Sequence, residues 1–493
     1  MSRLLRLARE NWLAGALFGV GFALRLVAQL SYRPALFYID TVRYLYNSGG
    51  NDPVGYRLPL KLLLIVGNFD LVAAVQHLLG LAMALAIYLV LVRRGTARWL
   101  GALAVVPVLL DAYQVQMEQM ILPDVWFEAL IVAGITVLLL RPGSPPRLRE
   151  VIGAGLIFGI SATLRQVGEI LILPALFYLV VTCRGWRVTT SRLAVLTAAF
   201  ALPILAYMTG SKILVGHFYL SHSGVTTTYG RMAYAADCAT LRLPPVERGL
   251  CPTPTQRALG PDWLEHGLKS PIRRYYTGPL SSRASQLVAD FNSAVLHQQP
   301  GQVLASYASD LPKLFAPSKL TSPGDPPLSR WQFQLSYPYL SPHATSAQVQ
   351  AAIASYGGGK PTVWRPGAVF LRRYQLGGGY TPGPVLAFCV LAGLAGSWLA
   401  CATRLRRAGR EQDQPPSWQQ LALCCLLFLG AGTAVLLMSD VFEFTWRYQL
   451  PALITLPPAG AAAIAAFLRL RPAGRPASAT ELAQPSEQVG LRD

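Results

Sequence analysis

An acidic residue lies among aromatic side chains directly after the first long apolar run of the sequence. The run from Trp12 to Leu30 is followed by Asp40 in "ALFYIDTVRYLYNSGG", with Tyr38 and Arg43 close by. Charged groups at membrane depth are costly, and where they persist they usually face a cavity and carry function. A carboxylate in such a place can act as a general base that takes a proton from an attacking hydroxyl. The alternative is structural, because Asp followed by Thr also starts helices well.

A second acidic stretch, "MEQMILPDVWFE", comes before and at the start of a later apolar run. Glu118 precedes this run and Asp124 begins it, so we expect both carboxylates to face the same outer cavity as Asp40. Together these three acids form the set of candidate catalytic residues. For Asp124, which follows Pro123, a helix-start acid favoured by the helix dipole is an equally good interpretation.

Arginines at membrane depth supply the opposite charge. Arg165 lies in "ATLRQVGEIL" between two short apolar stretches. The free-energy cost of a charged arginine at this depth favours a role in anion binding. An ion pair with Glu169, four residues along, is the structural alternative. Arg447 and Tyr448 stand in "FTWRYQLPALITLPP", where an anchor in the interfacial aromatic belt is an equal alternative to a ligand role. With Arg57 from the first outer segment, these residues form the candidate substrate-binding set.

Nucleotide-binding signatures are absent from the sequence. It contains no Walker A loop, no strand-linked G-x-G-x-x-G and no DxD motif on a soluble domain, and "YGGGK" and "LGGGY" are poor matches. A substrate phosphate should therefore reach the site through the membrane. The pair Gln76 and His77 inside an apolar run predicts interhelical hydrogen bonds rather than metal ligation. No cofactor is assigned, and the requirement for a divalent metal stays open.

The composition is that of a polytopic membrane protein. Of 493 residues, 53% are hydrophobic and only 14% are charged. The formal net charge of +19 would suggest nucleic acid for a soluble protein, but in a membrane protein it reflects the cytoplasmic Lys/Arg bias. We therefore exclude nucleic acid as a partner and take the lipid bilayer as the surroundings of the chain.

Apolar runs of about 17–25 residues predict membrane spans. They lie near 12–31, 69–92, 97–113, 121–140, 192–214, 383–403, 418–438 and 448–468. The region 151–181 is either one over-long helix or two short ones joined at "LRQVGE". Two helices place the basic clusters on one side, including Arg3, Arg6, Arg9, Arg93, Arg94, Arg98, Arg404, Arg406, Arg407 and Arg410. The sequence therefore predicts ten spans with both termini in the cytoplasm.

The spans divide the chain into four parts. Residues 1–214 form a seven-span catalytic module, and 383–470 hold the last three spans. Residues 215–382 are too long and too polar for a loop and predict a mostly helical extracytoplasmic domain. The tail, 471–493, is rich in Pro, Ala, Ser and Glu, which predicts a disordered cytoplasmic segment.

Two of the seven cysteines lie in the predicted extracytoplasmic domain. Cys238 and Cys251 stand in "ADCATLRLPPVERGLCP", where an oxidising compartment permits a disulfide. The alternative is a pair of free thiols. The remaining cysteines lie in or beside the predicted spans.

The order of these features resembles the GT-C superfamily of polyprenyl-phosphate-sugar-dependent glycosyltransferases, which includes aminoarabinose transferases, protein O-mannosyltransferases and arabinofuranosyltransferases. The stretches that carry the resemblance are "FYIDTVRYL", "MEQMILPDVWF", "ATLRQVGEILILP" and "WRYQLPALITLPP". It implies an all-α polytopic fold, with Asp40 as catalytic base and Arg165 near the carrier phosphate. Gln166 stands where the family often has proline. The likeness covers the first seven spans and, more loosely, the last three.

This resemblance implies a glycosyltransferase of the plasma membrane with its active site outside the cytoplasm. The donor would be a polyprenyl-phosphate sugar, and the acceptor a hydroxyl on a cell-envelope glycan, lipid or protein. Because phosphate is a good leaving group, one base suffices, unlike the carboxylate pair of glycosidases, and direct displacement inverts the anomeric centre. Two other classes stay open. One is a transporter or flippase of a lipid-linked saccharide, which more often has repeated halves, and the other is a membrane-anchored cell-envelope assembly protein.

Overall fold

Helices make up nearly all of the regular structure in the computed structural model, which describes residues 9–46, 53–221, 224–275, 281–337, 351, 353–406 and 416–470. The expected disordered tail, 471–493, lies outside the described residues. Within them the one sheet pairs two short strands, β1 (Tyr32–Arg33) and β2 (Thr362–Val363), in antiparallel register. The expected all-α architecture is therefore confirmed.

Among the described residues, six helices are long and apolar enough to cross a bilayer. They are α2 (Trp12–Ser31), α5 (Phe69–Arg93), α12 (Trp186–Val215), α20 (Gly383–Arg406), α21 (Ser417–Asp440) and α22 (Pro451–Leu470). Each corresponds to an expected span, so the chain is a polytopic membrane protein.

The other four expected spans are built from shorter helices. Residues 97–113 contain α6 (Arg98–Ala104) and α7 (Val106–Leu110), and 121–140 contain α9 (Asp124–Leu138). The region 151–181 divides into α10 (Leu148–Leu164), the 3-10 turn η1 (Gln166–Leu171) and α11 (Ile172–Thr182). Gly168 permits this turn to pack closely, because a Cβ there would lie 2.8 Å from the backbone nitrogen of Ala162. The interruption falls at Arg165, whose backbone is extended.

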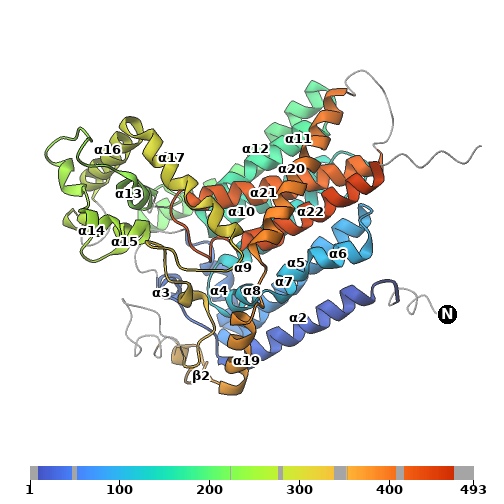
Figure 1. Cartoon of the computed structure of the whole chain (residues 1–493), viewed down its shortest axis with the longest axis horizontal. Coiled ribbons are helices and arrows are strands. Elements are labelled where there is room, and N and C mark those ends of the chain that lie inside the picture. The colour runs from blue at the N-terminus through green and yellow to red at the C-terminus, as the bar shows by residue number, and fades with distance from the viewer. Residues whose placement is uncertain are drawn as a thin grey trace, which may run out of the picture.

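Helices α21 and α22 form the centre of the bundle, and α20 packs on both (Figure 1). In α22, 83% of the most apolar window is buried, against 17% in α12. Helix α12 therefore turns most of its apolar side chains outward, as a lipid-facing helix does. Small residues allow the central helices to approach closely, since Gly460 lies against Cys389 and Gly396 against Ala463.

A second unit gathers at one end of the long helices (Figure 1). It contains α13 (Gly224–Ala235), α14 (Pro254–Arg257), α15 (Gly260–His266), α16 (Ser282–Gln298) and α17 (Pro300–Ala308). Its separate core includes Tyr229, Leu264 and Phe291. A disulfide joins Cys238 to Cys251, with Cα atoms 6.0 Å apart, so the predicted bridge is confirmed.

The second unit is fixed against the membrane helices. Arg231 of α13 is buried, and its Nη2 donates to Asp310 Oδ2 at 2.6 Å and to the carbonyl oxygen of Asp440 at 2.9 Å. Further along the chain, α19 (Arg365–Leu376) packs along α2. Trp331, which ends the 3-10 turn η5 (Leu328–Trp331), belongs to the same core as the membrane helices. The second unit is thus held at the end of α21.

Candidate active site

The first outer loop is joined by hydrogen bonds to the segment that precedes α9. Leu36 N donates to the carbonyl oxygen of Gln119 at 2.9 Å, and Ile121 N donates to that of Leu36 at 3.0 Å. Helix α3 (Ile39–Tyr46), which carries Asp40, follows directly. These bonds place Asp40 close to Asp124 at the start of α9.

Arg447 bridges the two carboxylates from the turn between α21 and α22. Its Nη1 donates to Asp40 Oδ2 at 2.7 Å. Its Nε and Nη2 donate to the two oxygens of Asp124 at 3.0 and 2.7 Å. A two-point contact of this kind is the strong geometry that arginine offers a carboxylate. Asp40 keeps 23% of its side chain exposed, against 3% for Asp124, so Asp40 is the more accessible of the two carboxylates.

Arg165 is the second cation of this cluster. Its Nη1 pairs with Asp124 Oδ1, and its guanidinium carbon lies 4.6 Å from the centre of the Tyr448 ring. Glu169, the alternative partner expected from the sequence, forms no ion pair with Arg165 in the described part of the chain. Asp124 therefore holds both guanidinium groups, and together with Asp40 they form a row of alternating charges.

The pKa of Asp40 lies below its ordinary value. Burial by itself raises the pKa of this carboxyl, but the guanidinium groups of Arg447 and Arg43 lower it by more. Opposite charges within a few ångströms favour the ionised form in this way. Asp40 is therefore an anion throughout the neutral range.

A cavity lies beside the charged cluster. It is lined by Asp124, Phe127, Glu128, Arg165, Val167, Val435, Ser439, Tyr448 and Pro451. The lining residues come from α9, from Arg165 and the following η1, from α21, and from Tyr448 and the start of α22, so the cavity lies where these segments meet. Polar and apolar side chains share its walls. The space is about 10 Å³, room for one water-sized group, so in this conformation it admits a single small polar group beside Arg165 and Glu128.

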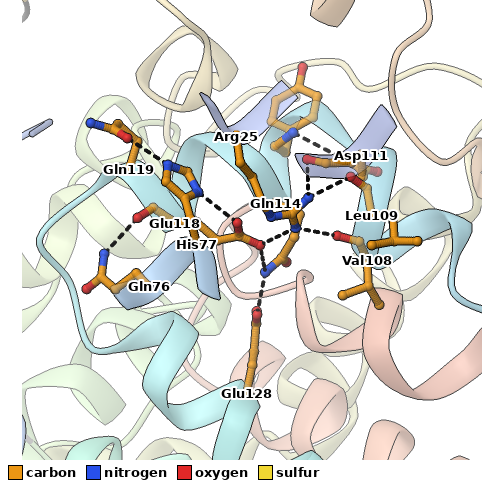
Figure 2. A network of polar contacts seen from close by, with 12 residues as sticks. Arg25, Gln76, His77, Val108, Leu109, Asp111, Gln114, Glu118, Gln119 and Glu128 are labelled. Atoms are coloured by element: carbon orange, nitrogen blue, oxygen red, sulfur yellow. Dashed lines mark hydrogen bonds and ion pairs between the residues drawn. The ribbon is translucent and has the colours of Figure 1, made fainter. Parts of the chain in front are cut away.

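Glu118 does not join this cluster, in contrast to the expectation from the sequence. Figure 2 shows it in a buried network, where Arg25 Nη2 lies 2.7 Å from Oε1 and His77 Nδ1 lies 2.9 Å from Oε2. Gln76 donates to the carbonyl oxygens of Glu118 and Met120 at 2.8 and 2.6 Å. The interhelical hydrogen bonds predicted for Gln76 and His77 therefore form. Glu118 neutralises a buried arginine and does not line the cavity.

Arg57 also stands apart from the cluster. It begins α4 (Arg57–Val66), and its side chain forms no hydrogen bond or ion pair with any other described residue. The neighbouring Tyr56 is buried and donates to Gln76 Oε1 at 3.0 Å. The structure therefore brings together five of the predicted site residues, namely Asp40, Asp124, Arg165, Arg447 and Tyr448.

Two charged residues inside apolar helices were missed by the sequence analysis. Arg25 lies in the middle of the first span, where the cost of its charge indicates a buried partner. Glu128 follows Asp124 by four residues, a spacing that puts both on one face of a helix. Both signals are present in the sequence, the first in "GFALRLVAQL" and the second in "PDVWFEAL".

The carboxylates of the cluster do not fit a divalent metal ion. Magnesium and calcium take several oxygen ligands, yet both oxygens of Asp124 and Oδ2 of Asp40 already accept hydrogen bonds from Arg447. Arg165 adds a second positive charge next to the same oxygens. Among the described residues, His, Cys, Asp and Glu form no group of three that could hold a metal. Guanidinium groups supply the positive charge of this site.

Comparison with solved structures gives a distant likeness, and the other comparisons give no match. No family model matches the sequence, and no curated protein matches it. Among solved structures, the chain is similar to the archaeal oligosaccharyltransferase AglB from Archaeoglobus fulgidus, in complex with an inhibitory peptide and a dolichol-phosphate, with a TM-score of 0.40 and 12% identity. The match covers 93% of this chain and 50% of AglB, so the chain spans about half the length of that protein. A likeness this distant carries no argument about activity.

Proposed function

We propose that the chain is an integral membrane glycosyltransferase that moves a sugar from a polyprenyl-phosphate carrier to an acceptor hydroxyl. The observation that carries this proposal is the bridge that Arg447 makes between Asp40 and Asp124. The bridge places Asp40, a partly exposed base, close to the cations Arg447 and Arg165. A cavity lined by polar and apolar side chains lies beside them, at the ends of membrane-length helices. Such a site suits a substrate that combines a lipid, a phosphate and a sugar.

Transfer is a direct displacement at the anomeric carbon. The acceptor oxygen forms its bond to this carbon while the bond to the phosphate oxygen breaks, and the configuration inverts. Asp40 takes the proton of the acceptor hydroxyl, which contributes on the order of 10²–10⁴-fold to the rate. The electron pair of the broken bond leaves with polyprenyl phosphate, so negative charge grows on the phosphate.

Arg165 and Arg447 stabilise this growing charge. Preorganised cations aimed at the place where charge develops lower the barrier without further reorganisation. Asp124 pairs with both guanidinium groups and is therefore a positioning residue for them. Tyr448 restricts Arg165 through the contact of its ring with the guanidinium group. The phosphate competes with the carboxylates for these cations, and Asp40 is thereby released to act as base.

We place the site on the extracytoplasmic side of the plasma membrane, with both termini in the cytoplasm. The arginine-rich segments support this orientation, because positive charge collects in cytoplasmic loops. The disulfide between Cys238 and Cys251 supports it as well, since disulfides persist in oxidising compartments. The second unit, which packs at the end of α21, then faces the cell envelope, where the acceptor glycan, lipid or protein lies.

Incubation of the purified full-length protein with a panel of polyprenyl-phosphate sugars tests this function. We expect release of polyprenyl phosphate from at least one donor when cell-envelope acceptors are present. Asp290→Asn is the matched control for Asp40→Asn, the variant that removes the proposed base. Asp290 is an exposed acid of α16 in the second unit and contacts Gln286. The turnover of Asp290→Asn should equal that of the wild type. Failure to cleave any donor, together with movement of intact lipid across vesicles, would favour the flippase class instead.

A further inference from the structure

We propose that Glu128 forms a sugar-recognition subsite in the cavity, in which its free oxygen Oε1 hydrogen-bonds a hydroxyl group of the glycosyl unit that the carrier delivers. This inference rests on the proposed function and deepens it. It assigns a separate residue to the sugar, while Arg165 and Arg447 meet the phosphate.

The Glu128 carboxyl is buried with one oxygen unpartnered. Only 1% of the residue is exposed. Its Oε2 accepts a hydrogen bond from Gln114 Nε2 at 2.8 Å, an interaction seen at one end of the network in Figure 2. Its Oε1 is also buried and has no hydrogen-bond partner among the described residues. Buried polar atoms are nearly always satisfied, so an orphan oxygen needs an explanation. One hydroxyl group of a ligand, entering the adjoining cavity with its room for one water-sized group, would supply one.

The position of Glu128 puts this oxygen next to the reacting groups. Glu128 and Asp124 are four residues apart on α9, so their side chains leave the same face of the helix. Both residues line the cavity, and Arg165 and Tyr448 line it too. A phosphate held by Arg165 would therefore carry its sugar past Glu128. Ser439, a further polar lining residue, lies on the opposing helix α21.

The chemistry of the carboxyl selects a hydroxyl as its partner. A hydroxyl both donates and accepts hydrogen bonds, so it satisfies Oε1 whether the carboxyl is ionised or protonated. A phosphate is a poor partner, because Glu128 forms no ion pair with any cation of the described chain and would repel a second anion. Hydroxyl groups are what a sugar adds to polyprenyl phosphate.

A purely structural role for Glu128 would be to hold Gln114. Gln114 Nε2 also lies 3.4 Å from Glu118 Oε1, so it links Glu128 to the network of Arg25 and His77. In that case, removal of either partner of the Glu128–Gln114 hydrogen bond would have the same effect. Gln114→Met is therefore the matched control for Glu128→Met, because each variant cuts the same bond from a different side.

Binding of two kinds of lipid to the full-length protein in nanodiscs tests the subsite. The probes are undecaprenyl phosphate alone and undecaprenyl phosphate carrying mannose, glucose or arabinose. The wild type should bind at least one glycosylated lipid more tightly than the bare one. Glu128→Met should reduce this preference about tenfold, the effect of one hydrogen bond, and leave the Kd of undecaprenyl phosphate within about twofold. Gln114→Met should keep the preference.

A second variant covers the case in which Glu128→Met does not fold. Glu128→Asp keeps the carboxyl and its burial but withdraws it by one methylene, so it should also lose the preference for the glycosylated lipid. An unchanged preference in the Glu128 variants, equal weakening of both lipids, or an equal loss in Gln114→Met would overturn the inference while leaving the glycosyltransferase proposal intact. Failure of the wild type to bind any of these lipids would instead remove the proposed function.

Discussion

Arg447 donates from Nη1 to Oδ2 of Asp40 at 2.7 Å, across 407 positions of the sequence. Asp40 follows α2, the first membrane-length helix, and Arg447 precedes α22, the last. The ion pair can form only when both ends of the chain belong to the same bundle. Packing of α22 therefore completes the charge cluster that the first outer loop begins.

Replacement of Arg165 by lysine should weaken donor use. If its guanidinium grips phosphate, Arg165→Lys lowers kcat/KM about tenfold or more, because a charge-assisted hydrogen bond contributes about 1.5–3 kcal/mol and lysine cannot reproduce the planar fork. Donor kinetics measure this directly. Glu169→Gln is the control, since Glu169 forms no ion pair with Arg165 in the described structure, and its effect should be mild. Unchanged kinetics for Arg165→Lys would remove this residue from the site.

Replacement of Arg447 by glutamine should change how activity and melting temperature depend on pH. In the wild type the pKa of Asp40 is lowered, so the stability that its charge contributes is present above the ordinary carboxyl pKa and is lost as the pH falls through the lowered value. Arg447→Gln removes the main cation and leaves the burial, so the pKa of Asp40 should rise. The loss of activity on acidification should then begin at higher pH, whereas the fall in melting temperature that Asp40 contributes in the wild type should shrink or reverse, because a buried carboxyl with a raised pKa is stabilised by protonation.

Melting curves and initial rates recorded from about pH 3 to 7, the range around the ordinary carboxyl pKa, test this shift. Asp290→Asn serves again as a control with an unchanged profile, because this exposed acid lies on α16. Superimposable profiles of the wild type and Arg447→Gln would show that Arg447 does not set the charge of Asp40.

Glu118→Gln should destabilise the protein without changing its chemistry. The substitution leaves Arg25 buried without its counterion, and breaking a buried ion pair costs about 3–5 kcal/mol. The melting temperature should fall, while the folded fraction keeps the donor KM and kcat of the wild type. Replacing both partners, Arg25→Met with Glu118→Met, should recover part of the loss because no charge is left unpaired. A normal melting temperature with lost turnover would place Glu118 in the active site after all.

Chelation of divalent metals should leave transfer nearly unchanged. The oxygens that a metal would need accept hydrogen bonds from Arg447, and the two arginines already supply positive charge. Transfer rates measured after dialysis against EDTA should remain within about twofold of the rate before dialysis, a change well below the tenfold that corresponds to 1.4 kcal/mol. Restoration of a lost rate by added manganese, and calorimetric binding of manganese that disappears in Asp40→Asn, would contradict this expectation.

The sequence predicted the helical spans and several members of the charged cluster for one physical reason. Charges at membrane depth are costly, so Asp40, Arg165 and Arg447 stand out against an apolar background. The disulfide followed from the placement of Cys238 and Cys251 in one polar segment. Composition and charge are local properties, and a sequence displays them directly.

Pairing is not a local property, and here the sequence was less informative. Glu118 and Asp124 are six residues apart and looked alike, yet one pairs with Arg25 of α2 and the other with Arg447. Only the packing of α2 against α7 and α8 (Ala112–Gln119) brings Arg25 to Glu118. The interruption at Arg165 was recognisable, but its partner was not. The neighbour four residues along, Glu169, was the natural choice, and tertiary structure offers Asp124 instead.

The most direct test of the account is the rate of sugar transfer by Asp40→Asn. The amide preserves the shape of the side chain and removes the base. The rate of polyprenyl-phosphate release that accompanies sugar transfer should therefore fall by about 10²–10⁴-fold. The melting temperature and the Kd for undecaprenyl phosphate should show that the variant still folds and binds lipid. Turnover close to that of the wild type in such a folded variant would contradict the assignment of Asp40 as the catalytic base.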